Sequence, residues 1–283
     1  MKKALTLEEA LKTPCPHRDK TLAQEPMTNY SSTPDGLHGM PLAFWAEWHL
    51  EDRPRRIALL MDDCQEEYRP YAEGILPNLQ KLVAVFREKK AKEEGICIAW
   101  SSWSRQFDDG ISNAMDRWYG PRGLRADNPE NAAYIFTGEA GLQPLKEIAP
   151  TDAEKADGWF YHGKHLDMFW TFNDDETSYL DEKLKALDID TIVIAGLWTD
   201  ECVLATAYAG SSRGYDVVLV QDATATATEN HDVALKVANS TVANVLTTAE
   251  VVTYMKDAFK LGAPGAVKGK HHPDGRKTSP STD

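Results

Sequence analysis

The segment Thr191-Ile-Val-Ile-Ala195 runs directly into Gly196-Leu-Trp-Thr-Asp-Glu-Cys-Val203. Its first five residues carry no charge and are mostly β-branched, which predicts a strand buried on both faces. Residues 201–213 are predicted to form a helix that stops at Gly214, because glycine is favoured just past a helix C-terminus. A buried strand, a tight turn and a helix form the unit from which parallel sheets are built.

The same alternation continues on both sides of this segment. Further apolar runs predict strands at residues 57–61, 96–100, 158–161 and 216–220. Apolar residues at helical spacing predict helices at residues 75–92, 178–187, 231–241 and 249–261. Strands that alternate with amphipathic helices indicate right-handed crossovers and a mainly parallel sheet covered by helices on both faces. The sequence therefore predicts an α/β fold.

Polar residues stand where two of these strands end. Asp63 comes just after the first apolar run, and Thr199 and Cys202 come just after the run that ends at Ala195. In open parallel sheets, ligands bind outside the carboxyl ends of the strands. We therefore expect these three side chains at one edge of the sheet, and a site there.

Composition narrows the class of protein. The chain has 283 residues, with 31 Lys plus Arg against 44 Asp plus Glu and a formal net charge of −13. That charge disfavours binding to nucleic acid phosphates and to anionic membranes. No apolar stretch is long enough for a transmembrane helix, and the charged N-terminus does not resemble a secretory signal. The four scattered cysteines have no metal-ligand spacing, so we expect reduced thiols and a cytoplasmic protein.

Three regions are predicted along the chain. Residues 1–54 contain several prolines with Gly and Ser, and they are read as an N-terminal extension. Residues 55–262 form the folded domain. Residues 263–283 are rich in Gly, Pro and Lys, and they are read as a flexible C-terminal tail.

Cys202 is the most informative residue. The N–H groups at a helix N-terminus favour a thiolate and can stabilise an oxyanion. Thr199 is suited to cap that helix. The alternative is that Cys202 is a small buried residue without a chemical role, as free cysteines commonly are.

Asp63 and Lys164 complete a possible reactive group. A carboxylate beside a thiol can accept its proton and return it to a leaving group. A lysine between the two would lower the pKa of both and favour their ionised forms. Each residue also has a simpler interpretation, Asp63 as a turn residue and Lys164 as an exposed lysine.

Together these motifs resemble the isochorismatase-like cysteine hydrolases over roughly residues 55–258. Asp63-Cys-Gln65 after an apolar strand is similar to that family's D-x-Q signature. The segment 196–203, followed by Ala205-Thr-Ala207, resembles its G-x-x-T-x-x-C-V motif. Lys164 stands where the family has a lysine, although its spacing to Phe169 is one residue shorter than the common pattern.

The resemblance implies a three-layer α/β/α sandwich with a six-stranded sheet, assembled as a homo-oligomer, either a dimer or a tetramer. It implies Asp63, Lys164 and Cys202 as the catalytic triad. It also implies an oxyanion hole from the N–H groups of Thr199 and Cys202, and a cis peptide bond between Trp198 and Thr199. The residues expected to line a small-molecule pocket are Gln65, Trp103, Phe169 and Trp198.

The implied activity is hydrolysis of a small amide, carbamoyl or ureide substrate through an acyl-thioester. No metal and no cofactor are expected, because the metal-binding set of the nicotinamidases is not recognisable near Trp103 or downstream of it. Two alternatives stay open. One is isochorismatase-type vinyl ether hydrolysis, in which Asp63 matters more than Cys202, and the other is a non-catalytic binding scaffold. A redox role for Cys202 has less support, since no resolving cysteine lies near it in sequence.

Overall fold

The structure is a computed structural model that describes residues 50–103, 140–164 and 166–265. The chain divides into two units, residues 1–52 and 53–283. In the first unit the structure describes a short 3-10 helix, η3 (Leu50–Asp52). The predicted N-terminal extension up to residue 49 and the predicted tail beyond residue 265 lie outside the described residues.

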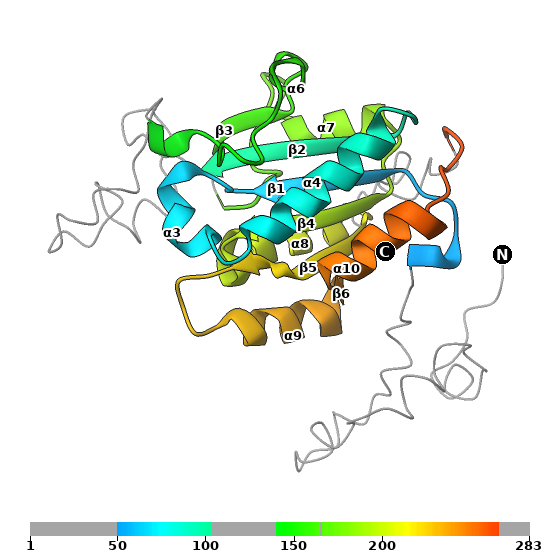
Figure 1. Cartoon of the computed structure of the whole chain (residues 1–283). Coiled ribbons are helices and arrows are strands. Elements are labelled where there is room, and N and C mark those ends of the chain that lie inside the picture. Colours follow the sequence, from blue (N-terminus) through cyan, green and yellow to red (C-terminus); the bar gives the residue numbers. More distant parts are fainter. Residues whose placement is uncertain (1–49, 104–139, 165, 266–283) are drawn as a thin grey trace, which may run out of the picture. The chain divides into compact units, whose positions relative to one another are not determined.

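The second unit contains a six-stranded, all-parallel sheet with the strand order β3-β2-β1-β4-β5-β6 (Figure 1). The prediction of an α/β fold with a six-stranded sheet is therefore confirmed. In chain order the strands are β1 (Ile57–Asp62), β2 (Ile96–Trp103), β3 (Phe160–Lys164), β4 (Thr191–Leu197), β5 (Asp216–Ala225) and β6 (Asn244–Leu246). Strands β1, β2 and β4 are buried along their whole length, as the apolar runs within them predict.

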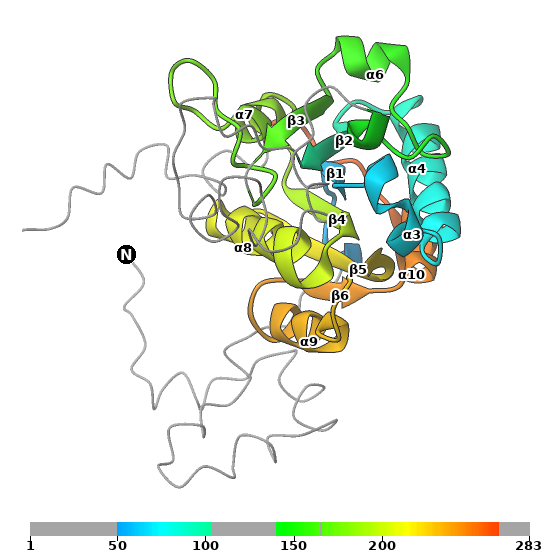
Figure 2. The same cartoon turned by 90° about the vertical axis from the view of Figure 1, so that its left-hand side faces the viewer.

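Helices cover both faces of this sheet. Helices α4 and α10 lie on one face, and α7 and α8 lie on the other, as the two views of Figures 1 and 2 agree. The helices are α3 (Arg69–Ala72), α4 (Leu76–Lys90), α6 (Asp152–Ala156), α7 (Tyr179–Ala186), α8 (Leu204–Ser212), α9 (His231–Thr241) and α10 (Thr248–Thr253). Shorter turns are η4 (Glu66–Tyr68), η6 (Ala140–Leu142), the π-helical η7 (Thr199–Val203) and the π-helical η8 (Tyr254–Ala258).

The predicted elements differ from the observed ones mainly at their ends. Residues 201–213 were predicted to form one helix, whereas a π-helical turn precedes α8. The strand predicted at residues 158–161 begins and ends later, as Phe160–Lys164. Periodicity reveals that an element exists, but hydrogen bonding decides where it ends.

Gly196 allows β4 to approach β1 at the point where both strands end. It pairs in register with Asp62 and has a φ of +128°. A Cβ atom at this position would lie 2.0 Å from the Asp62 carbonyl oxygen, so no other residue fits without moving a strand. The close approach fixes the geometry of the sheet edge that carries Asp63.

Charged residues anchor the opposite edge, where the strands begin. Arg53 bonds Asp190 at 2.7 Å and Asp216 at 2.8 Å. Arg55, only 1% exposed, bonds the same Asp216 carboxylate and donates to the Thr191 hydroxyl at 3.0 Å. This network ties the start of β1 to the starts of β4 and β5.

Candidate functional site

Asp63 lies just past the end of β1 in a tight turn. It is fully buried and has a φ of +49°, a conformation that aspartate adopts more readily than most residues. Ser101 of β2 accepts a hydrogen bond from the Asp63 backbone N–H, and its Oγ lies 3.2 Å from Asp63 Oδ1. The carboxylate is thus held at the carboxyl ends of two neighbouring strands, as predicted for this residue.

Gln65 joins the ends of β1 and β2. Its Oε1 accepts from the Trp103 backbone N–H at 2.8 Å, and its Nε2 donates to the Trp103 carbonyl at 3.2 Å. The side chain is fully buried. Both ends of its carboxamide are used in this clamp, so the structure gives Gln65 a positioning role for the turn after Asp63.

Cys202 is buried in η7, directly after β4. A cis peptide bond joins Leu197 to Trp198, so the prediction of one between Trp198 and Thr199 is wrong by one residue. The backbone N–H groups of Glu201 and Val203 both bond the Trp198 carbonyl at 3.1 Å. The bond from Val203 spans five residues, which makes this turn π-helical, a form that often marks functional sites.

Thr206 shows which way the Cys202 helix faces. It lies four residues after Cys202, so the two side chains share a helix face. Its hydroxyl donates to Asp62 Oδ2 at 2.7 Å. The face that carries Cys202 therefore packs toward the end of β1, where Asp62 and Asp63 stand.

Lys164 is the last residue of β3 and pairs in register with Trp103 of β2. This places its backbone at the same edge of the sheet as Asp63, two strands away in the order β3-β2-β1. Its side chain lies outside the described part of the chain. A role for Lys164 beside the carboxylate and the thiol stays a prediction.

Phe169 is another residue that was predicted to line the pocket. It is fully buried and stacks on Tyr215 with ring centroids 5.9 Å apart, while the Arg213 guanidinium lies 4.7 Å from its ring centre. Arg213 follows the far end of α8 from Cys202, and Tyr215 precedes β5. The contacts that the structure describes therefore place Phe169 in the core under that end of the helix, and its role in lining a pocket stays a prediction.

Trp198, in contrast, lies beside the turn that follows Asp63. Its ring centroid is 4.7 Å from that of Tyr68 and 4.9 Å from that of Tyr71. Trp198 is almost buried, whereas Tyr71 is half exposed. These three aromatic rings join η7 to η4 and α3, and give this edge of the sheet an apolar wall.

A polar clamp holds η7 from its other side. Asp200 accepts hydrogen bonds from Thr226, Thr228 and Asn230, in the segment between β5 and α9. Burial would raise the pKa of Asp200, but these bonds lower it below its ordinary value. The Thr199 hydroxyl lies 2.9 Å from His231 Nδ1, the first residue of α9.

Sequence reasoning missed Asp62, Ser101, Thr206, Asp200 and His231 as residues of this site. Asp62 is next to Asp63 in the sequence, and Ser101 is one of two serines that end an apolar run in β2, so these two positions gave a local signal. Thr206, Asp200 and His231 lie far along the chain from Asp63, and the fold brings them to the site.

Glu67 is a further titratable group, two residues after Gln65. Burial raises the pKa of Glu67 to about 8, and a hydrogen bond from Gln65 Nε2, 3.4 Å long, lowers it only in part. A carboxyl group that titrates near neutral pH at the edge of a site is suited to proton transfer.

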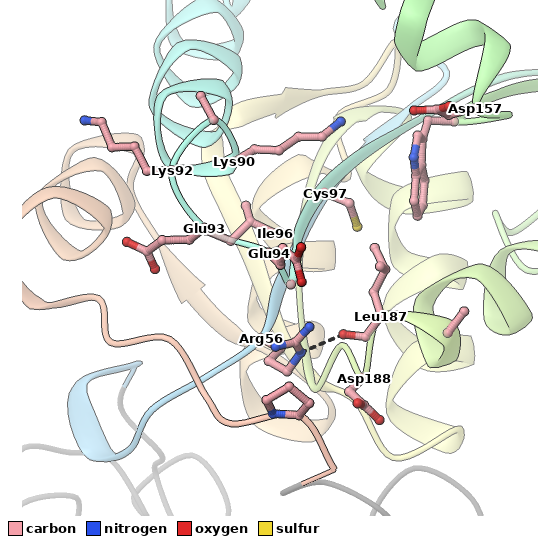
Figure 3. Close-up of a pocket in the computed structure, with 15 residues that line it drawn as sticks. Arg56, Lys90, Lys92, Glu93, Glu94, Ile96, Cys97, Asp157, Leu187 and Asp188 are labelled. Atoms are coloured by element: carbon pink, nitrogen blue, oxygen red, sulfur yellow. Dashed lines mark hydrogen bonds between the residues drawn. The ribbon is translucent and has the colours of Figure 1, made fainter.

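The structure has a cavity of about 730 Å³ at the opposite edge of the sheet (Figure 3). Its lining includes Arg56, Gly95 and Ile96, which precede or begin β1 and β2, and Leu187, which follows α7. Arg56 Nε donates to the Leu187 carbonyl at 2.7 Å, the dashed line in Figure 3. Acidic and basic residues mix around this cavity, and none of the predicted site residues lines it.

Within residues 50–103, 140–164 and 166–265, no three His, Cys, Asp or Glu side chains gather as metal ligands would. The segment after Trp103, where the nicotinamidase ligand set would be sought, lies outside these residues. Metal independence therefore stays a prediction. The described helices include none that is both long enough and apolar enough to cross a membrane.

The comparisons with known proteins agree on one family. A model of the isochorismatase domain matches residues 57–250. The phenazine biosynthesis protein PhzD1 of Pseudomonas aeruginosa is 29% identical over 209 residues, which cover 73% of this chain and 89% of that protein. A probable isochorismatase of Pseudomonas chlororaphis is 24% identical over 209 residues, with the same coverage of 73% and 89%.

Solved structures share the fold. A cysteine hydrolase from Pseudomonas syringae pv. phaseolicola superposes with a TM-score of 0.58 at 21% identity, and the match covers 75% of this chain and 97% of that one. An isochorismatase-like hydrolase from Alkaliphilus metalliredigens gives a TM-score of 0.52 at 22% identity, covering 70% and 98%.

Proposed function

Because the chain belongs to the isochorismatase-like hydrolase family, we propose that it is a metal-independent cysteine hydrolase of a small amide, carbamoyl or ureide substrate. The observation that supports the proposal is that a buried carboxylate and a buried thiol, Asp63 and Cys202, follow neighbouring parallel strands at the same edge of the sheet. Thr206, on the helix face of Cys202, bonds Asp62, the residue next to Asp63. A thiol at the start of a helix and a carboxylate at the adjacent strand end are the parts that nucleophilic catalysis needs.

The reaction divides into two steps. Asp63 takes the proton from Cys202 Sγ, and the sulfur attacks the carbonyl carbon of the substrate. The N–H groups of Thr199 and Cys202 stabilise the oxyanion, and the amine leaves with the proton that Asp63 returns. A water molecule, deprotonated by Asp63, then hydrolyses the thioester and releases the acid and the free thiol. Lys164 would stabilise the ionised forms of both catalytic groups.

Vinyl ether hydrolysis is the second candidate, and the similarity to a probable isochorismatase favours it. In this reaction a carboxylic acid protonates the substrate, so turnover depends on Asp63 and little on Cys202. Retention of Cys202 at the start of the helix favours acyl chemistry, because that reaction uses a thiolate.

The test is intact-protein mass spectrometry after mixing the protein with a panel of amides, ureides and isochorismate, while product release is followed. Wild type should gain an acyl group on Cys202, and Cys202→Ser should lose both the adduct and at least about a thousandfold of the turnover. Cys97→Ser is the matched control, since Cys97 is a buried thiol whose pKa is raised by burial to about 12. Isochorismate turnover that survives Cys202→Ser would establish the vinyl ether reaction instead. If no compound is turned over and none forms an adduct, that result would support the non-catalytic scaffold.

Three further features belong to the proposal. Assembly as a dimer or tetramer and a small-molecule partner rest on the family resemblance, and a cytoplasmic location rests on the four scattered cysteines. Sedimentation velocity on the purified chain tests the assembly, and a single species of monomer mass would reject it.

A further inference from the structure

Two acidic residues stand in succession at the end of β1. Asp62 is the last residue of the strand, and Asp63 begins the turn. Both side chains are fully buried. Adjacent buried carboxylates are costly, because desolvation and mutual repulsion both oppose ionisation.

A single serine hydroxyl lies between them. Ser101 Oγ is 3.3 Å from Asp62 Oδ1 and 3.2 Å from Asp63 Oδ1. A hydroxyl has one hydrogen, so it can donate to only one of these carboxylates at a time. The two carboxylates therefore share one donor.

Thr206 donates a further hydrogen bond to Asp62. Its hydroxyl oxygen accepts from the Met168 backbone N–H at 3.0 Å, and its hydrogen goes to Asp62 Oδ2 at 2.7 Å. A hydrogen bond donated to a carboxylate favours the ionised form. This bond therefore favours the ionised form of Asp62, and in the proposed function Asp63 is the carboxylate that takes the proton.

We propose that Asp62 is a positioning residue that makes Asp63 a stronger proton acceptor. This rests on the proposed function, in which Asp63 takes the thiol proton of Cys202. The S–H bond breaks and an O–H bond forms on Asp63, while the electron pair stays on sulfur. Protonation of Asp63 removes its repulsion with Asp62, and Ser101 can then bond Asp62 alone.

The Cys64 thiol is also affected by the charges of Asp62 and Asp63. Its Sγ is 3.7 Å from the Asp62 carbonyl oxygen. Burial raises the pKa of the Cys64 thiol well above its ordinary value, and the charges of Asp62 and Asp63 raise it further. Cys64 is thus a titratable group beside Asp62 and Asp63, and Cys202 from the helix after β4 and Lys164 from the end of β3 are expected near them.

The experiment follows alkylation of Cys202 by iodoacetamide against pH, read by peptide mass spectrometry. It needs no substrate. Asp62→Asn keeps the shape and the hydrogen-bond acceptor but removes the charge, so the acidic midpoint of the profile should fall by about one pH unit. Ser101→Ala removes a donor to the carboxylates and should move the midpoint upward. Opposite shifts from two neighbouring substitutions would not arise from general damage to the fold.

The matched control is Asp181→Asn, another buried aspartate bonded by a hydroxyl, that of Tyr215 at 2.8 Å. It should leave the midpoint unchanged, and Asp63→Asn should abolish the acidic limb. An unchanged or raised midpoint in folded Asp62→Asn would overturn the proposal. If that variant does not fold, Ser101→Ala decides, and an unmoved midpoint rejects the shared donor. Failure of the proposed function would appear separately, as turnover that survives Cys202→Ser.

Discussion

The buried aspartates at the two edges of the sheet have different bonding partners. Where the strands begin, Asp190 and Asp216 are met by the guanidinium groups of Arg53 and Arg55. Where the strands end, Asp62 and Asp63 stand side by side, bonded by the hydroxyl groups of Ser101 and Thr206. The first arrangement ties strands together by opposite charges. In the second, the hydrogen bonds that the structure describes come from hydroxyl groups, which neutralise no charge, and Lys164 is the cation expected nearby.

The first arrangement should contribute mainly to the stability of the fold, and the second mainly to the proposed reaction. A buried acid beside an arginine is stabilised as an anion and has little tendency to take a proton. An acid beside another acid takes a proton more readily, at some cost to folding. Substitutions at the two edges should therefore have different effects on activity and on the free energy of unfolding.

Asp63→Asn tests the catalytic edge and has the largest expected effect. Turnover should fall by about a thousandfold, because the proton acceptor is lost. The free energy of unfolding should stay within about 1 kcal/mol of wild type or rise, since one buried charge is removed. Steady-state kinetics and urea denaturation measure the two quantities. A loss of several kcal/mol would mean that Asp63 is structural.

Arg55→Met tests the opposite edge. It keeps the side-chain volume but leaves the Asp216 carboxylate without one of its two cations, so the free energy of unfolding should fall by about 3 kcal/mol. Turnover per folded molecule should not change. Lys92→Met is the control, because the Lys92–Glu88 pair is exposed and should contribute less than about 0.5 kcal/mol. Equal losses in both variants would contradict the role given to Arg55.

His231→Ala tests the clamp on η7. The Thr199 hydroxyl loses the partner at 2.9 Å. We expect a fall in kcat of about tenfold with little change in KM, the effect of about one hydrogen bond on the turn that carries Cys202. His231→Asn places an amide atom near the position of Nδ1 and should restore most of the rate. If alanine and asparagine behave alike, the hydrogen bond has no part in the effect.

Glu67→Gln should have the smallest effect, and it depends on pH. Because burial raises the pKa of Glu67 to about 8, the folded state keeps a proton that the unfolded state releases near pH 4.5. Its contribution to stability is therefore complete below that pH, and it is lost as pH rises toward 8. The Tm of wild type should fall between pH 5 and pH 8 by a few degrees more than that of Glu67→Gln. Parallel Tm curves would show that Glu67 titrates normally.

The sequence alone predicts the sheet well, because apolar strands such as β1 and β4 follow directly from hydrophobic runs. It also places Asp63 and Cys202 at one edge, since the carboxyl ends of parallel strands coincide. The π-helical turn at Thr199–Val203 could not be predicted, because its hydrogen bonds depend on the tertiary position of Trp198.

Side-chain roles were harder to predict than strand positions. Gln65 was expected to face a substrate, but its amide bonds the Trp103 backbone. Phe169 was expected beside Cys202, yet the loop after β3 carries it under the other end of α8. Sequence spacing does not reveal how a loop turns, and this decides which face a residue meets.

The strand order has a consequence for the growing polypeptide. Asp62 meets Thr206, a residue 144 positions further along the chain, only when β4 inserts beside β1. Until then β1 can pair only with β2, and its other edge has no strand to bond because β4 is not yet synthesised. During translation the strands β1 and β2, with Asp62 and Asp63, therefore exist first as an incomplete sheet. That sheet has no catalytic activity, and its unpaired edge can associate with other strands. Cys202 follows β4 in the chain, so the thiol and the carboxylate cannot meet before β4 has joined β1.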